Sequence, residues 1–114
     1  MANAREVVVL SGVRTAIGDY GGSLQDVAPT ALGGMVIREA IARAKVDVNE
    51  IGHLVLGNVI HTEPKDMYIS RVAGIKGGLP QASGALTVNR LCGSGLQAII
   101  SAAQTILLGD TDCA

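Results

Sequence analysis

One cysteine stands where a strand is expected to turn into a helix. Cys92 follows the run 88–91, Val-Asn-Arg-Leu, and precedes Gly93-Ser94-Gly95. The glycines permit a sharp bend, because glycine adopts backbone conformations closed to other residues. A helix that begins just after Cys92 points unpaired N–H groups and the positive end of its dipole at the sulfur. These groups stabilise a thiolate, so the spacing predicts that Cys92 is a nucleophile.

The same bend also supplies electrostatic support for a reaction. N–H groups at the helix start can hold the oxyanion that forms when Cys92 attacks a carbonyl. The alternative is structural: free cysteines are often buried and inert, and Cys92 would then only fill a tight turn. The spacing by itself leaves both interpretations open.

The other chemically capable residues fit less well. Cys113 is expected to be a buried apolar residue near a strand start. His53 is expected to be structural, while His61 lies in a loop that can approach a substrate or a subunit. Arg14 is expected to anchor a loop or a subunit contact. The His and Cys residues lack metal-ligand spacing, so no metal site is predicted.

Two polar segments are also assigned no chemistry. Glu63, Lys65 and Asp66 are expected to form a solvated loop face. The segment 93–95 lacks the lysine and the glycine spacing of a phosphate-binding loop.

Alternating strands and helices are expected to position Cys92. The Val-rich run 6–10 predicts a buried strand, and Pro29 suits the first turn of a helix. Gly33 and Gly34 inside that helix should cost about 1 kcal/mol each, which predicts close contact with a neighbouring backbone. Alternation of this kind predicts an α/β fold with a parallel-type sheet covered by helices. The expected strands are 6–10, 53–59 and 85–91, and the expected helices are 29–45, 67–76 and 93–108.

The stretch 91–109 contains no charged residue. Its length alone would admit a membrane span, but small and polar residues interrupt it, so a helix buried between protein layers is predicted. One small sheet cannot cover such a helix all round. A further strand also begins at 112–114. Residues 1–114 are therefore expected to be the first part of a larger domain, with a complete small domain as the alternative.

Composition excludes several classes of function. The 114 residues have a net charge of −1 and contain no Trp or Phe, so Val, Ile, Leu and Ala must form the core. No basic surface is available for nucleic acid or an anionic membrane. Two cysteines are too few for a disulfide framework, and the N-terminal apolar run is too short for a signal peptide. A reducing, cytoplasmic setting is expected.

Several segments, in order, resemble the thiolase family. The segment 89–98, Asn-Arg-Leu-Cys-Gly-Ser-Gly-Leu-Gln-Ala, resembles the nucleophile segment of those enzymes. The loop 61–68 is similar to that of bacterial β-ketothiolases with broad chain-length preference, which are similar to acetyl-CoA acetyltransferases. Further matches are 11–16 with Gly21-Gly22, 57–59, Arg71 and Ala73 with 78–80, and Gly109-Asp110.

The resemblance implies a thiolase fold with a buried central helix, and a two-step acyl exchange between coenzyme A thioesters. Cys92 would take an acyl group from an acyl-CoA, and the carbanion of a second acetyl-CoA would attack it in a Claisen condensation. The reverse reaction is thiolytic cleavage of a 3-ketoacyl-CoA. Coenzyme A thioesters are substrates, and no further cofactor is implied.

The resemblance also implies partners. The family's activating His, its second catalytic Cys in a Cys-x-Gly-Gly-Gly segment, and a further His and Asn cannot be matched here. The chain is therefore expected to be inactive without the remainder of the same polypeptide, in a homodimer or homotetramer. The alternatives are a ketoacyl-synthase-like condensing enzyme, or a non-catalytic acyl-binding or assembly module of the same fold.

Overall fold

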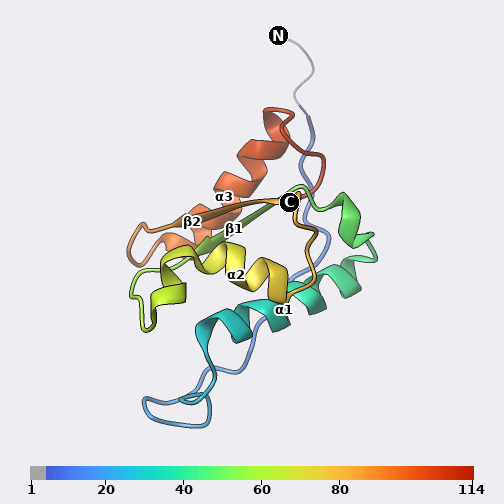
Figure 1. Cartoon of the computed structure of the whole chain (residues 1–114). Coiled ribbons are helices and arrows are strands. Elements are labelled where there is room, and N and C mark those ends of the chain that lie inside the picture. Colours follow the sequence, from blue (N-terminus) through green and yellow to red (C-terminus); the bar gives the residue numbers. More distant parts are fainter. Residues whose placement is uncertain (1–4) are drawn as a thin grey trace.

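Helices cover both faces of a two-stranded parallel sheet in the computed structural model, which describes residues 5–114 (Figure 1). Strand β1 pairs with β2 in parallel, from His53 opposite Gly84 to Gly57 opposite Val88. The prediction of a parallel α/β arrangement is therefore confirmed. The elements are α1 (Pro29–Ala44), the 3-10 helix η1 (Val48–Glu50), β1 (His53–Gly57), the 3-10 helix η2 (Pro64–Tyr68), α2 (Ile69–Lys76), β2 (Gly84–Val88) and α3 (Ser94–Leu107).

The alternation of side chains along β1 separates the layers. Leu54 and Leu56 point to the side of α2 and α1, where they lie against Gly74 and Gly33. Gly57 faces the other side and touches the start of α3. The order of layers is thus α3, then the sheet, then α2 with α1, because successive side chains of a strand point to opposite faces.

The core between the sheet and α1 is aliphatic. Its buried cluster consists of Ile37, Ile51, Ala73 and Leu79. A Cβ atom at Gly33 would lie 2.8 Å from Cβ of Ala73, and one at Gly34 would lie 3.0 Å from Cβ of Lys76. The predicted close contact at the glycine pair is confirmed, and α2 is the neighbour.

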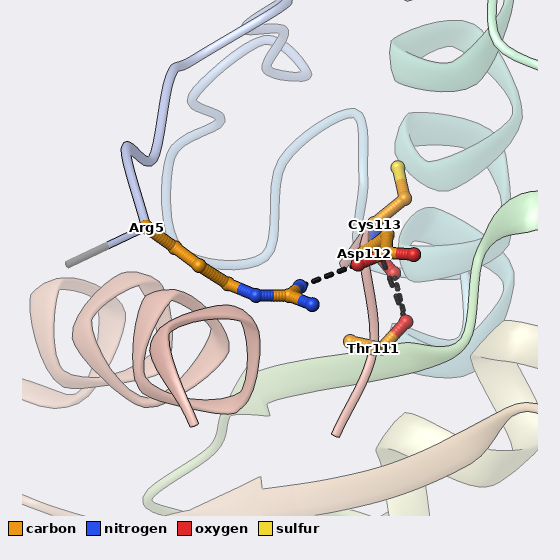
Figure 2. Close-up of polar contacts among 4 residues, drawn as sticks. All are labelled: Arg5, Thr111, Asp112 and Cys113. Carbon is orange, nitrogen blue, oxygen red and sulfur yellow. Dashed lines mark hydrogen bonds and ion pairs between the residues drawn. The ribbon is translucent and has the colours of Figure 1, made fainter. Parts of the chain in front are cut away.

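The two ends of the described chain lie together beside the start of β1. Arg5 forms an ion pair with Asp112, and Thr111 Oγ1 donates a hydrogen bond to the carbonyl of Cys113 at 3.0 Å (Figure 2). The same carbonyl accepts the Gly52 N–H at 3.0 Å. No strand is assigned at 112–114, although this bond places the segment next to β1.

The strand expected at 6–10 is not formed within the described residues. A strand requires a neighbour that accepts and donates backbone hydrogen bonds, and no described strand pairs with this segment. Val8, Val9 and Leu10 are instead exposed. The expected strand 85–91 ends early, at Val88, where its pairing with β1 ends, and Leu91 further on has a positive φ of 47° that an extended chain cannot accommodate.

Helix α3 is buried on one side only. Ser94 and Ala98 face the sheet and are buried. The opposite side is apolar and exposed, so the all-round cover expected for this helix is not supplied by residues 5–114. That side consists of Leu96, Ile99, Ile100 and Leu107. In the part of the chain that the structure describes, no helix combines the length and apolarity needed to cross a membrane.

Candidate active site

Cys92 lies at the tip of a tight bend that joins β2 to α3, and its side chain is exposed. Two overlapping turns form the bend. The Gly93 N–H donates to the Arg90 carbonyl at 3.0 Å, and the Ser94 N–H donates to the Leu91 carbonyl at 3.0 Å. Within residues 5–114 Cys92 is exposed and therefore not the buried residue of the structural alternative. We call residues 89–94 the cysteine elbow.

Two polar side chains brace the cysteine elbow. Asn89 Oδ1 accepts the Leu91 N–H at 3.0 Å. Ser94 Oγ accepts the Arg90 N–H at 2.8 Å and donates to the Leu91 carbonyl at 2.7 Å. The glycines at 93 and 95 pointed to a bend, but the sequence analysis missed this bracing. An Asn just before the turn was the available signal, because Asn side chains bond backbone N–H groups two residues on.

The start of α3 presents unpaired donors close to Cys92. The first bond of the helix runs from the Gln97 N–H to the Gly93 carbonyl at 2.9 Å. Among the described residues, no carbonyl accepts the N–H groups of Gly95 and Leu96. This end of the helix carries a partial positive charge, which stabilises an anion beside it.

A second loop meets the same edge of the sheet. The Asn58 N–H donates to the Val88 carbonyl at 3.0 Å, so the ends of β1 and β2 lie side by side. Asn58 Nδ2 contacts His61 Nδ1 at 2.8 Å. His61 and Cys92 thus follow the carboxyl ends of neighbouring strands.

Asp66 holds this second loop from inside, which corrects the expectation of a solvated face for Asp66, whereas Lys65 is exposed as expected. Its carboxylate is buried and accepts from the Thr62 N–H and Oγ1, both at 2.7 Å, and from the Glu63 N–H at 3.1 Å. The Thr62 bonds, the Glu63 N–H and the nearby His61 lower the pKa of Asp66, against the opposing effect of burial. Pro64 three residues after His61, with an acid at 66, was the sequence signal of a capped helical turn.

Replacing Asp66 with Asn should lower the melting temperature of the complete protein at neutral pH by several degrees. The native pKa lies below the ordinary value of 3.8, so the ionised carboxylate stabilises the fold above that pH. This stabilisation is lost as the pH falls through the lowered native pKa. Calorimetry should therefore show that the difference in melting temperature between the native protein and Asp66→Asn shrinks below pH 3.8. The exposed Asp19 is the matched control as Asp19→Asn, and an equal effect of both variants would contradict the prediction.

The cysteine elbow, and the fold that holds it, lie in a recognisable family domain. Residues 7–114 match the family model described as "Thiolase, N-terminal domain". The chain belongs to the thiolase family.

Thiolases from several organisms are similar to this chain. Beta-ketothiolase BktB of Cupriavidus necator is 70% identical over 110 residues, which cover 96% of this chain and 28% of that protein. Bacillus anthracis acetyl-CoA acetyltransferase superimposes with a TM-score of 0.89 at 36% identity, covering 95% of this chain and 27% of that one. Human mitochondrial 3-ketoacyl-CoA thiolase, solved in complex with CoA, superimposes with a TM-score of 0.87 at 35% identity. The match covers 90% of this chain and 26% of that one. The thiolase fold is confirmed, and the chain spans about a quarter of its relatives' length.

The second cysteine of this thiolase chain has a different environment from Cys92. Cys113 is partly buried and packs against the core cluster that contains Ile51. Burial, helped by the negative charge of Glu50, raises the pKa of the Cys113 thiol. A raised pKa keeps the thiol protonated and unreactive, which agrees with the apolar role expected from the sequence.

His53 and Arg14 lie outside the cysteine elbow. The ring of His53 covers Gly84, where a Cβ atom would come within 2.5 Å of Nδ1. This contact fits a structural role, but the buried Nε2 of His53 has no hydrogen-bond partner among residues 5–114, so the satisfied structural histidine expected from the sequence is not found. Arg14 donates to the neighbouring Thr15 carbonyl at 2.9 Å. It lines an open hollow of about 940 Å³ between residues 12–16 and α1, and no residue of the cysteine elbow lines that hollow.

Proposed function

We propose that the complete protein is an acyltransferase that condenses or thiolytically cleaves coenzyme A thioesters through an acyl group carried on Cys92. Its reaction is of the acetyl-CoA C-acetyltransferase type. The observation that carries the proposal is the exposed Cys92 at the start of α3, within a domain of the thiolase family. The relatives named as acetyl-CoA acetyltransferase and beta-ketothiolase support the substrate class.

The geometry of the cysteine elbow suits the first half of the reaction. The Cys92 thiolate attacks the thioester carbonyl, the bond from that carbon to the coenzyme A sulfur breaks, and coenzyme A leaves as a thiol after taking a proton. The free N–H groups at the start of α3 favour the anionic sulfur before attack. Covalent catalysis of this kind divides one difficult step into two easier ones and gives ping-pong kinetics.

The second half of the reaction requires groups from outside this chain. A second acetyl-CoA loses an α-proton, its carbanion attacks the acyl group on Cys92, and the carbon–sulfur bond to Cys92 breaks to release a 3-ketoacyl-CoA. The base for that proton, and the family's further His, Cys and Asn, are not matched in residues 1–114. We therefore expect this domain alone to be inactive.

The exposed apolar side of α3 supports the remainder of the polypeptide as the partner of this domain. Leu96, Ile99 and Leu107 leave a continuous apolar strip facing away from the sheet. Burying such side chains is favourable by about 1.5–3 kcal/mol each. A homodimer or homotetramer and a cytoplasmic location complete the proposal; the free thiols of Cys92 and Cys113 agree with a reducing compartment.

Mass spectrometry of the complete protein after incubation with acetyl-CoA tests the proposal. We expect one acetyl group on the peptide that contains Cys92, removed again by added coenzyme A. Decarboxylation of a malonyl thioester would instead indicate the ketoacyl-synthase alternative. Binding of acetyl-CoA without any adduct would indicate a non-catalytic module and refute the proposed chemistry.

A further inference from the structure

Ser94 is the buried polar residue closest in sequence to Cys92. Its hydroxyl must therefore find its hydrogen-bond partners within the protein. The residue is only 5% exposed. The oxygen accepts from the Arg90 N–H at 2.8 Å and donates to the Leu91 carbonyl at 2.7 Å. One side chain on α3 therefore bonds the backbone on both sides of the Leu91 Cα atom.

That bond pattern matters because Leu91 is strained. Its φ of 47° is in the left-handed region, which a bulky non-glycine residue rarely adopts. Strained backbone persists only where the surrounding structure holds it in place. The contacts that hold Leu91 come from Ser94 Oγ, the Ser94 N–H and Asn89 Oδ1.

The strained residue sets the direction of Cys92. The carbonyl of Leu91 and the N–H of Cys92 belong to one planar trans peptide, in which they point in opposite directions. Ser94 fixes that carbonyl toward the helix with its hydroxyl, so the Cys92 N–H is directed away from the helix. The plane of this peptide also contains the Cα atom of Cys92, from which the side chain projects.

We propose that Ser94 is a positioning residue that holds the Leu91–Cys92 peptide so that the Cys92 sulfur stays beside the start of α3. This proposal rests on the proposed acyl transfer at Cys92. Without the hydroxyl, the Arg90 N–H and the Leu91 carbonyl lose a buried partner, and Leu91 relaxes from its left-handed conformation. Cys92 then loses its fixed orientation in the bend before α3.

Two rates measured on the complete protein test the proposal in the Ser94→Ala variant. Acetylation of Cys92 by acetyl-CoA should slow about 10- to 100-fold, with KM changed by less than about threefold, since small misplacement of a reacting group has effects of this size. Alkylation of the Cys92 peptide by iodoacetamide should slow roughly 3- to 10-fold at neutral pH. A merely structural role would leave both rates unchanged when they are expressed per mole of folded protein.

Ser101→Ala is the matched control, because Ser101 lies on the same helix and accepts a hydrogen bond from Gln97 Nε2 at 3.0 Å. It should leave both rates within about twofold. Ser94→Thr keeps the hydroxyl and should recover most of the alkylation rate. A folded Ser94→Ala protein with unchanged rates would overturn the proposal. Failure of both Ser94 variants to fold would overturn it too, since the hydroxyl would then determine the fold and not the placement of Cys92.

The two rates also separate this proposal from the proposed function. If the native protein is never acetylated by acetyl-CoA, the acyltransferase function fails. The iodoacetamide comparison still reports whether Ser94 controls the sulfur. If the native protein is acetylated and Ser94→Ala behaves like Ser101→Ala in both assays, only the positioning role fails.

Discussion

Replacing Cys92 with Ser in the complete protein is expected to lower turnover of acetyl-CoA by about 10⁴-fold or more. A serine hydroxyl stays protonated at neutral pH, so the helix start has no anion to stabilise. None of the hydrogen bonds that form the cysteine elbow involves the Cys92 side chain. The variant should therefore fold as the native protein does. Steady-state kinetics and intact mass after incubation with acetyl-CoA measure both consequences.

Cys113→Ser is the matched control for this substitution. Cys113 is partly buried with a raised thiol pKa, so its loss should leave turnover within about twofold of the native protein. Substantial turnover by the Cys92→Ser variant would show that acyl transfer does not use Cys92, and loss of turnover in the control would show that Cys113 is not a merely apolar residue.

The position of Cys92 could be predicted from sequence because the determinants are local. The expected strand 85–91 before it, the glycines after it and the uncharged helix beyond are contiguous, and each acts through backbone preferences over a few residues. The bracing by Ser94 could not be predicted in this way. Serine at a helix start usually caps the helix's own N–H groups, whereas Ser94 Oγ bonds the backbone that precedes it.

Side-chain contacts, some local and some between distant residues, account for most of what the sequence analysis missed. The burial of Asp66 depends on a loop that folds back around its carboxylate, while its composition alone indicated a solvated surface. The run 6–10 has the composition of a buried strand, yet composition cannot specify the neighbouring strand, and residues 5–114 contain none beside it. The glycine pair in α1 allowed one such contact to be predicted, because glycine lowers the stability of a helix unless a close contact compensates. Ala73 and Lys76 supply that contact.

Gly57 makes the contact that joins the end of β1 to the cysteine elbow. Adding a side chain at this position is therefore expected to affect both stability and the reaction at Cys92. A Cβ atom at this position would lie 2.7 Å from the carbonyl carbon, 2.8 Å from the carbonyl oxygen and 2.9 Å from Cβ of Ser94. Two of these atoms are backbone, so the first turn of α3 must move to admit a methyl group. The sequence showed Gly57 only as the residue before Asn58, without this contact.

Gly57→Ala is therefore expected to destabilise the complete protein by about 1–3 kcal/mol, the usual cost of overpacking a tight contact. It should also slow acetylation of Cys92 by roughly tenfold, because the start of α3 is displaced from the sulfur. Urea denaturation and the rate of adduct formation measure the two effects. Gly12→Ala is the matched control, since a Cβ atom there meets nothing within 4 Å. Stability lost without any change in acetylation would mean that the cysteine elbow tolerates a shift of α3, and that the contact with β1 serves packing alone.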